Sequence, residues 1–182
     1  MNYKPKFFRL KTFKLLLIAF LAVSITSCSS DDDGADTSAS ILGVWIGQDV
    51  DYSGTSTTTI EGLPPVTADF VGETTESDFT LTFTEDPNEL VSEGSYTVEL
   101  TFTIAGETQT QTQTLNFLED GTWSRSGDTL TVTADGVTQD YQIVELTEST
   151  LRLSAATTTT ETEPTTGASV EVTINLEAIL TR

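Results

Sequence analysis

Residues that could perform chemistry are few in this chain. It has no histidine, and its single cysteine is Cys28. Without histidine there is no Ser-His-Asp or Cys-His nucleophile, no histidine-ligated zinc and no histidine that changes charge near neutral pH. A single cysteine also excludes a disulfide within one molecule. No glycine-rich phosphate loop is present either. Any catalysis would therefore rest on carboxylates alone.

The most suggestive carboxylates are Asp49 and Asp51. Two residues apart in a strand, they would share one face. They are either a pair for acid/base work or cation binding, or two solvated acids near a strand end, and we favour the second. Glu119 and Asp120 precede Gly121 and indicate a turn.

The run Asp31-Asp32-Asp33-Gly34 has the start of a calcium loop. Leu42, however, stands where such a loop needs a bidentate glutamate. An enzyme acting on glycans through carboxylates stays the weakest hypothesis, because no acidic pair lies at the centre of a motif. We therefore predict no enzyme, no catalytic residue, no metal and no cofactor.

The N-terminal segment has the pattern of an export signal. Residues 1–14 carry five basic and no acidic side chains, and residues 15–23 are apolar throughout. This predicts a helical signal peptide over residues 1–27, because the apolar run is too short for a permanent membrane span. Ile25-Thr26-Ser27-Cys28 resembles the lipobox of bacterial lipoproteins. That resemblance implies a lipid (palmitate) on Cys28, which would anchor the protein to a membrane. The alternatives are an ordinary signal peptide or an uncleaved anchor helix.

Residues 28–40 are predicted to be the lipidated cysteine and an acidic, disordered tether. The run from Ser29 to Gly34 is similar to the surface-export signal of lipoproteins from the Bacteroidetes group. This implies the outer membrane, with the domain exposed at the cell surface. The alternative is a solvated spacer that only holds the domain off the bilayer, facing the periplasm.

The chain that follows the signal peptide is strongly acidic. From Cys28 onward it keeps three of the eight basic residues and all 28 acidic ones, a formal charge of −25 with no lysine. Such a surface repels phosphate backbones, so no nucleic-acid partner is expected. It favours solubility. The expected partners are the membrane, through the lipid, and a small apolar ligand. The domain itself is expected to be monomeric.

Hydrophobic alternation with a period of two predicts antiparallel strands. It runs through residues 79–84, 96–104, 129–134, 151–155 and 170–180. Each run places apolar side chains on one face and threonine or glutamate on the other. No stretch after residue 40 has a helical period. The length suits one domain over residues 41–182.

Turn signals separate these runs: Glu93-Gly94, Ala105-Gly106, Asp120-Gly121, Ser126-Gly127 and Asp135-Gly136. We expect eight to ten strands in an up-and-down meander, joined mostly by tight hairpins. Tyr141 and Ile143 fall out of phase with Val144 and Leu146, which predicts a bulge. Residues 53–77 suggest a strand pair with a long loop, and residues 156–168 a long hairpin or mobile loop. Residues 108–113 are predicted to extend a strand.

Two stretches carry a resemblance to a known family. Gly43-Val44-Trp45 resembles the Gly-x-Trp signature of lipocalins, and residues 115–154 are similar to lipocalin-like lipoproteins of Bacteroidetes. The strands alone would fit a closed barrel or a two-sheet sandwich, and the resemblance implies the all-β, closed barrel. It also implies that Trp45 plugs the base beneath an arginine, either Arg152 or Arg182, of which we choose Arg182. Trp45 as a ligand-stacking residue is the alternative.

The inner face of such a barrel would collect large apolar residues. In a wide barrel they line a cavity, and in a narrow one they form a core. The predicted lining residues are Phe79, Phe83, Tyr96, Leu100, Phe102, Tyr141 and Ile174, with Leu130 and Leu176 beside them. Our first hypothesis is a surface lipoprotein that binds or sequesters a small hydrophobic ligand. The alternative is a structural or adhesive module whose loops, 53–77 and 156–168, bind a protein or glycan.

Overall fold

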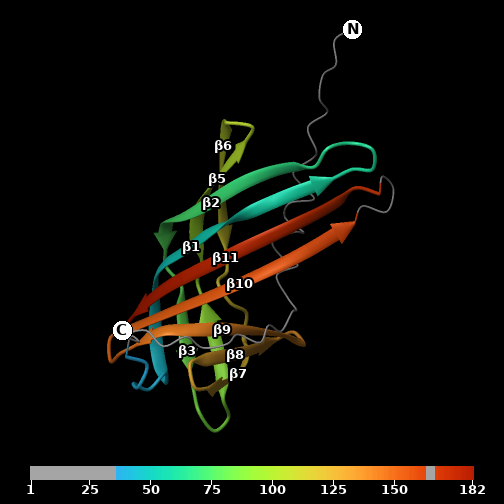
Figure 1. The fold of residues 1–182 in the computed structure, drawn as a ribbon. Coiled ribbons are helices and arrows are strands. Elements are labelled where there is room, and N and C mark those ends of the chain that lie inside the picture. The colour runs from blue at the N-terminus through green and yellow to red at the C-terminus, as the bar shows by residue number, and fades with distance from the viewer. Residues whose placement is uncertain (1–35, 163–166) are drawn as a thin grey trace.

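The computed structural model describes residues 36–162 and 167–182 and is all-β over these residues (Figure 1). The signal peptide, Cys28 and most of the tether lie outside the described residues. The strands are β1 (Gly43–Thr59), β2 (Val66–Ser77), β3 (Thr80–Phe83), β4 (Glu89–Glu93), β5 (Tyr96–Ile104), β6 (Glu107–Leu115), β7 (Gly121–Ser126), β8 (Thr129–Ala134), β9 (Val137–Leu146), β10 (Thr150–Thr162) and β11 (Ser169–Thr181). No helix of the described chain is long and apolar enough to cross a membrane.

Eight of these strands close into an antiparallel barrel. Their order is β1-β3-β4-β7-β8-β9-β10-β11, and β11 pairs with β1 to complete the circle. Closure removes the exposed strand edges that an open sheet of these eight strands would present. The predicted barrel is thereby confirmed.

The other three strands continue the barrel strands past a bend. Strands β2 and β3 both pair antiparallel with β1, so they run in the same direction. By the same logic β4 continues into β5, and β6 into β7. The prediction that Glu93-Gly94 and Asp120-Gly121 are reversing turns was therefore wrong: both lie at bends. Glycine serves either purpose: Gly94 has a φ of +81°, and at Gly121 a Cβ would lie 2.2 Å from the carbonyl oxygen of Thr133.

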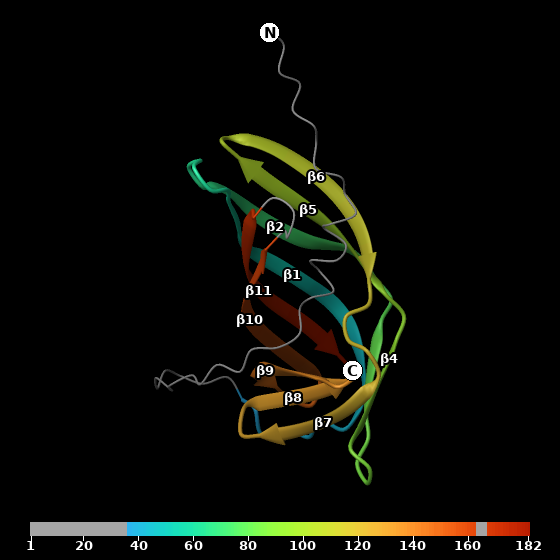
Figure 2. The same ribbon diagram turned by 90° about the vertical axis from the view of Figure 1, so that its right-hand side faces the viewer.

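The barrel is closed at one end and open at the other. Strand β8 has six residues, whereas β1 has 17 and β10 and β11 have 13 each. At about 3.3 Å per residue, β8 covers about 20 Å and β1 about 55 Å. The long strands therefore rise past β7–β9 as a curved sheet in the order β6-β5-β2-β1-β11-β10 (Figure 2). We call these two parts the closed half and the open half.

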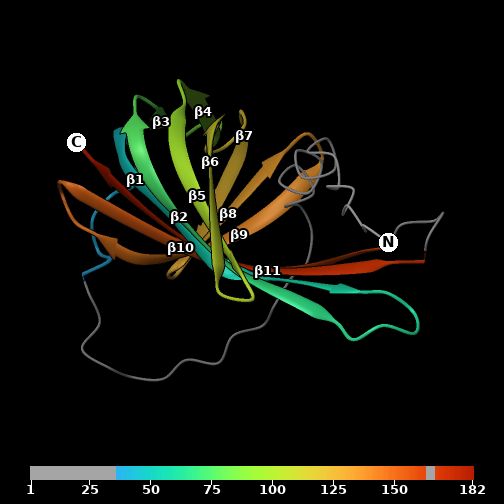
Figure 3. The ribbon, with the colours of Figure 1, turned by 90° about the horizontal axis from the view of Figure 1, so that it is seen from above.

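Two hairpins of the open half extend to the same side of the molecule (Figure 3). The β1–β2 hairpin keeps strand structure up to Thr59 and resumes it at Val66, so residues 53–77 are mostly strand with a short tip. The β10–β11 hairpin similarly extends to Thr162 and Ser169. Residues 108–113 belong to β6, as expected.

Local sequence explains the tight turns and the bulges. Ala105-Gly106 and Asp135-Gly136 each have two consecutive positive φ angles, the conformation of a two-residue type I′ hairpin. Val144 is the extra residue of a bulge, because Arg152 faces Glu145 while Leu153 faces Ile143. The predicted bulge is confirmed. It turns Tyr141, Ile143 and Leu146 all inward.

Candidate functional site

The base of the closed half is built around Trp45. Its side chain is fully buried, and its indole Nε1 donates a hydrogen bond to the carbonyl of Ile41, 2.8 Å away. The guanidinium carbon of Arg182 lies 4.2 Å from the centroid of the Trp45 ring. Arg182, rather than Arg152, therefore covers the plug. At this distance a cation–π attraction contributes about 0.5–2 kcal/mol.

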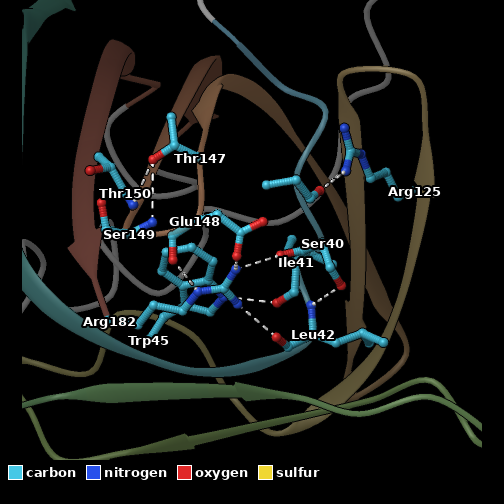
Figure 4. Close-up of polar contacts among 11 residues, drawn as sticks. Ser40, Ile41, Leu42, Trp45, Arg125, Thr147, Glu148, Ser149, Thr150 and Arg182 are labelled. Carbon is cyan, nitrogen blue, oxygen red and sulfur yellow. Dashed lines mark hydrogen bonds and ion pairs between the residues drawn. The ribbon is translucent and has the colours of Figure 1, made fainter.

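The same guanidinium ties three segments together (Figure 4). It donates to the carbonyl of Leu42 at 2.8 Å, to that of Ser40 at 3.1 Å and to that of Glu148 at 2.7 Å. Gly43 follows Leu42 with φ of +112°, which a side chain would strain. The predicted base residues Gly43, Trp45 and Arg182 thus meet in one place, and their contacts are structural.

A second arginine holds the segment that leads into the barrel. Arg125 donates to the carbonyl of Thr37 at 2.5 Å and to that of Ala39 at 3.3 Å. Arg125 and Arg182 together satisfy four carbonyls between residues 37 and 42. Sequence reasoning missed the Arg125 contacts, because nothing local marks an arginine on β7 as a partner of residues 37–39. Arg152 differs: it pairs with Glu145 and Glu177 on the barrel surface.

The interior of the closed half is filled by side chains. Phe79, Phe83, Leu130 and Tyr141 are buried there, together with Leu81, Leu90, Ile143, Leu146, Leu151, Leu153 and Leu180. Trp123 packs edge-on against Phe83 at a centroid separation of 5.7 Å and donates to the carbonyl of Thr84. The structure therefore places Phe79, Phe83 and Tyr141 in a packed core.

Three tyrosines lie near the boundary between the halves. The hydroxyls of Tyr52 and Tyr96 are hydrogen-bonded to each other, and their rings stack at 6.4 Å. Phe117 contacts both Tyr96 and Tyr141. Burial raises the pKa of Tyr96 to about 12, and it also raises the pKa of Tyr52 and Tyr141. All three side chains are therefore neutral at physiological pH.

The concave face of the open half follows from the strand register, since directly opposite residues of an antiparallel pair share a face. One row across the sheet is Thr157, Ile174, Gly54, Phe70, Phe102 and Gln109. The next row toward the closed half is Ala155, Leu176, Tyr52, Gly72, Leu100 and Gln111. The row toward the tip is Thr159, Val172, Ser56, Ala68, Ile104 and Glu107. The predicted residues Leu100, Phe102 and Ile174 thus share this face, and Tyr96 lies at its lower end.

Charge is segregated between the two faces of this sheet. Six acidic residues alternate with the concave rows and so point outward: Asp51, Asp69, Glu73, Glu99, Glu171 and Glu177. Among the described residues of this sheet whose register places them on the concave face, only Glu107 and Glu161 are charged. Both lie near strand ends, at the rim of the face. The outer surface is strongly acidic, whereas the concave face is apolar or neutral.

Glycines on β1 and β2 let large side chains pack close against the backbone, Gly47 in the closed half and Gly54 and Gly72 on the concave face. A Cβ at Gly47 would lie 2.1 Å from the Phe79 ring, and one at Gly54 would lie 2.7 Å from the Phe70 ring. A Cβ at Gly72 would lie 2.8 Å from Leu100. Any larger residue would push these side chains away. The signal was present in the sequence as glycines inside strands, which mark a close approach.

Two hollows lie outside the core. One of about 340 Å³ is lined by Ile104, Ala105, Glu107 and Gln109 at the β5–β6 hairpin. The other, about 130 Å³, lies at the strand bends beside Ser77, Asp78, Ser95 and Tyr96. The first adjoins the tip row of the concave face, because Ile104 and Glu107 belong to both.

The Asp49 and Asp51 pair lies on the outer face of β1. Both side chains face away from the barrel interior, since Val50 and Tyr52 between and beside them face inward. Burial, and then the charge of Asp51, raises the pKa of Asp49. In the described part of the chain no group of three or more metal-type ligands comes together.

An eight-stranded, up-and-down barrel with a tryptophan plug beneath an arginine defines the class of small antiparallel β-barrels with one closed end. The family model of the lipocalin-like domain matches residues 41–153, more than half of the chain. The chain therefore belongs to the lipocalin-like domain family. No curated protein and no solved structure gives a match.

Proposed function

We propose that the open half binds a small, uncharged apolar molecule on its concave face. The observation that carries this proposal is the charge segregation: a chain with many acidic residues keeps them off one face of one sheet, except for two at its rim. Lipocalin-like barrels suit small hydrophobic ligands. A charged ligand would lose hydration on this face without a partner there, whereas an apolar one gains about 25 cal/mol per Å² buried.

The filled core of the closed half supports a ligand position in the open half. Phe79, Phe83 and Leu130 occupy the centre of the closed half. A ligand would therefore lie against the rows around Phe102 and Ile174, with the neutral hydroxyls of Tyr52 and Tyr96 at the inner end. We propose no catalytic role, since the chain has no histidine and the two acids on the concave side, Glu107 and Glu161, lie apart at the rim.

Two adjacent residues of β1 provide a matched test. Ser56 lies in the concave tip row and is half-buried, whereas its neighbour Thr55 faces outward and is exposed. Ser56→Asp puts a carboxylate onto the binding face, and Thr55→Asp adds the same charge to the outer face. The readout is the fluorescence of the neutral probe N-phenyl-1-naphthylamine, titrated with each variant after circular dichroism has verified folding.

We expect wild type and Thr55→Asp to bind the probe alike and Ser56→Asp to bind at least tenfold more weakly, because a carboxylate desolvated by the ligand lacks a partner. Equal binding by the two variants, or no binding by wild type, would overturn the proposal. Native mass spectrometry of protein purified from its own host, with the lipid removed, should in addition show a retained small molecule.

We further propose that the protein is a lipoprotein anchored through Cys28 and displayed at the outer-membrane surface of a bacterium of the Bacteroidetes group. The support is the sequence pattern of residues 15–34. In Cys28→Ala the protein should leave the membrane fraction, and if it stays there at wild-type levels the anchor assignment fails. Protease treatment of intact cells should degrade the wild-type chain if it is surface-exposed and spare it if it faces the periplasm.

A second candidate function is adhesion through the tip of the β1–β2 hairpin. Three large apolar residues are exposed there: Ile60 at 41 %, Leu63 at 61 % and Val66 at 55 %. Exposed apolar side chains gathered on one loop indicate a contact surface. A triple serine variant of these residues should lose binding to a glycan array or a host protein if the tip is adhesive. Unchanged binding would leave the concave face as the functional surface.

A further inference from the structure

The last strand of the open half has an unpaired edge. Strand β6 pairs with β5 along its full length, from Glu107 to Leu115, and no other described strand pairs with it (Figure 2). Such an edge presents a row of backbone N–H and C=O groups that a further strand can pair with. The pairing with β5 has no register shift, so no bulge twists this edge away.

Most of β6 also lacks the usual protections of an edge strand, since only Glu107, at the hairpin end, is a charged residue on the concave side. Proteins guard edges with lysine, proline, bulges or inward-pointing charges. Residues 108–114 read Thr-Gln-Thr-Gln-Thr-Gln-Thr, with no charge and no proline. This run contains none of the 28 acidic residues of the chain. It allows a second strand to approach without the repulsion that the rest of the surface would impose.

The sequence of β6 is complementary to itself when reversed. In an antiparallel pair centred on Gln111, Thr110 faces Thr112 and Gln109 faces Gln113 of the other strand. Thr108 then faces Thr114, and Glu107 faces Leu115, so no like charges meet. The chain already uses such pairs: the hydroxyls of Thr97 and Thr114 on β5 and β6 are 3.1 Å apart, and those of Thr158 and Thr173 are 3.0 Å apart. Cross-strand threonine pairs stabilise sheets, and stacked glutamines add hydrogen bonds.

We propose that the β6 edge pairs with the β6 edge of a second copy of this chain, around a two-fold axis at Gln111. The pairing is isologous, so it closes as a dimer. It joins two open halves into one continuous sheet of twelve strands, twice the six of a single open half. The sequence alone led us to expect a monomer. That expectation took no account of this edge, because only the fold shows that β6 is the last strand of the sheet.

The rival is pairing of β6 with the unpaired stretch of β10 in another copy. Beyond Ser154, β10 pairs only with β11 among the described residues. A β6–β10 contact is heterologous, so it would lead to open chains of molecules rather than dimers. The β10 stretch also carries Glu161 on the concave side. Self-pairing of β6 involves no such charge at its centre.

Single cysteines test the register in the full-length chain. Residues directly opposite across an antiparallel pair have Cβ atoms about 4.5–5.5 Å apart, within reach of a disulfide after a small adjustment. Gln111→Cys places two thiols at the two-fold axis. Gln109→Cys does not, because the two copies of residue 109 lie about 13 Å apart along the strands. Thr101→Cys on β5 is the matched control, one strand inside the edge.

Each variant is expressed at native level in host cells and oxidised with copper phenanthroline. The wild-type chain, whose only cysteine is Cys28, controls for any cross-link through that residue. We expect a disulfide-linked species of twice the chain mass for Gln111→Cys, and none for Thr101→Cys or Gln109→Cys alone. Coexpressed Gln109→Cys and Gln113→Cys should link to each other. Absence of the Gln111→Cys dimer overturns the proposal. Equal linking by all variants also overturns it, as does a Gln111→Cys link to a different protein.

Discussion

The guanidinium of Arg182 lies over the indole of Trp45, with 4.2 Å between the guanidinium carbon and the ring centroid. The two residues lie near opposite ends of the barrel sequence: Trp45 is on β1 and Arg182 directly follows β11, and these two strands are the pair that closes the barrel. Arg182 also bonds the backbone of residues 40, 42 and 148. One side chain thus holds the closing seam, the plug and the β9–β10 turn together.

Replacing Arg182 should therefore destabilise the barrel more than replacing a surface arginine. Arg182→Lys keeps the charge but loses the planar fork that reaches three carbonyls. We expect the free energy of unfolding, measured in urea, to fall by about 1–3 kcal/mol. Arg152→Lys is the control, since Arg152 pairs with one exposed and one half-buried glutamate on the barrel surface, and it should cost under about 1 kcal/mol. Equal losses would mean that the seam does not depend on Arg182.

The bend at Gly94 should tolerate no side chain. Gly94 and Gly62 both have φ of +81°, but a Cβ at Gly94 would lie 2.4 Å from the carbonyl oxygen of Asp78, whereas nothing lies within 4 Å at Gly62. Gly62→Ala should cost about 1 kcal/mol, the conformational penalty alone. Gly94→Ala adds a clash with backbone and should cost at least about 2 kcal/mol more. Thermal unfolding of the two variants measures the difference, and similar melting temperatures would contradict a steric role for Gly94.

Alternation of apolar residues was enough to predict β3, β5, β8, β11 and the start of β10, because each of these strands buries one face. The bulge at Val144 followed from the same alternation falling out of phase. The direction of the chain at Gly94 could not be predicted in this way, because a glycine with positive φ occurs in hairpins and in bends alike. What decides between a hairpin and a bend is that the two strands on either side of Gly94 pair with different partners, β4 with β3 and β5 with β2.

The division into a closed and an open half was equally hidden. Alternation tells which face of a strand is buried but not how far the strand extends beyond its neighbour. The short β8 therefore did not reveal in the sequence that the longer strands continue past it. The contacts of Arg125 with residues 37 and 39 and the flat packing of Phe70 on Gly54 depend on tertiary geometry. The base was accessible only through family resemblance, since spacing alone does not bring Trp45 to Arg182.

The buried tyrosines should resist ionisation until the protein unfolds. In the unfolded chain a tyrosine has a pKa of about 10, whereas burial raises that of Tyr96 to about 12. Between these values the unfolded state binds fewer protons than the folded one, so stability falls as the pH rises. Phenolate absorbance should therefore appear together with the loss of the circular dichroism signal. Tyr96→Phe should reduce this alkaline sensitivity, and phenolate formed in the folded protein would contradict the burial of these side chains.

Asp49 should carry an unfavourable charge at neutral pH. Its pKa is raised, first by burial and second by the charge of Asp51. The folded state therefore holds this proton to higher pH than the unfolded state, and stability falls as the pH rises from the ordinary aspartate pKa, about 3.9, through the raised value. Asp49→Asn removes that charge, so the variant should be more stable than wild type near neutral pH. The advantage should disappear at a pH below the ordinary aspartate value, where both forms are neutral.

The control for Asp49→Asn must separate burial from the reduction of overall negative charge. Asp69→Asn removes one charge from the exposed, outward face of β2 and reduces general repulsion by the same amount. The free energy of unfolding of both variants is measured in urea at low salt and at about 1 M salt. This separates the two effects, because salt screens the general repulsion more than it screens a partly buried charge. Asp49→Asn should keep its stabilising effect at high salt and Asp69→Asn should lose it. If both effects vanish together, the charge of Asp49 acts only as part of the acidic surface.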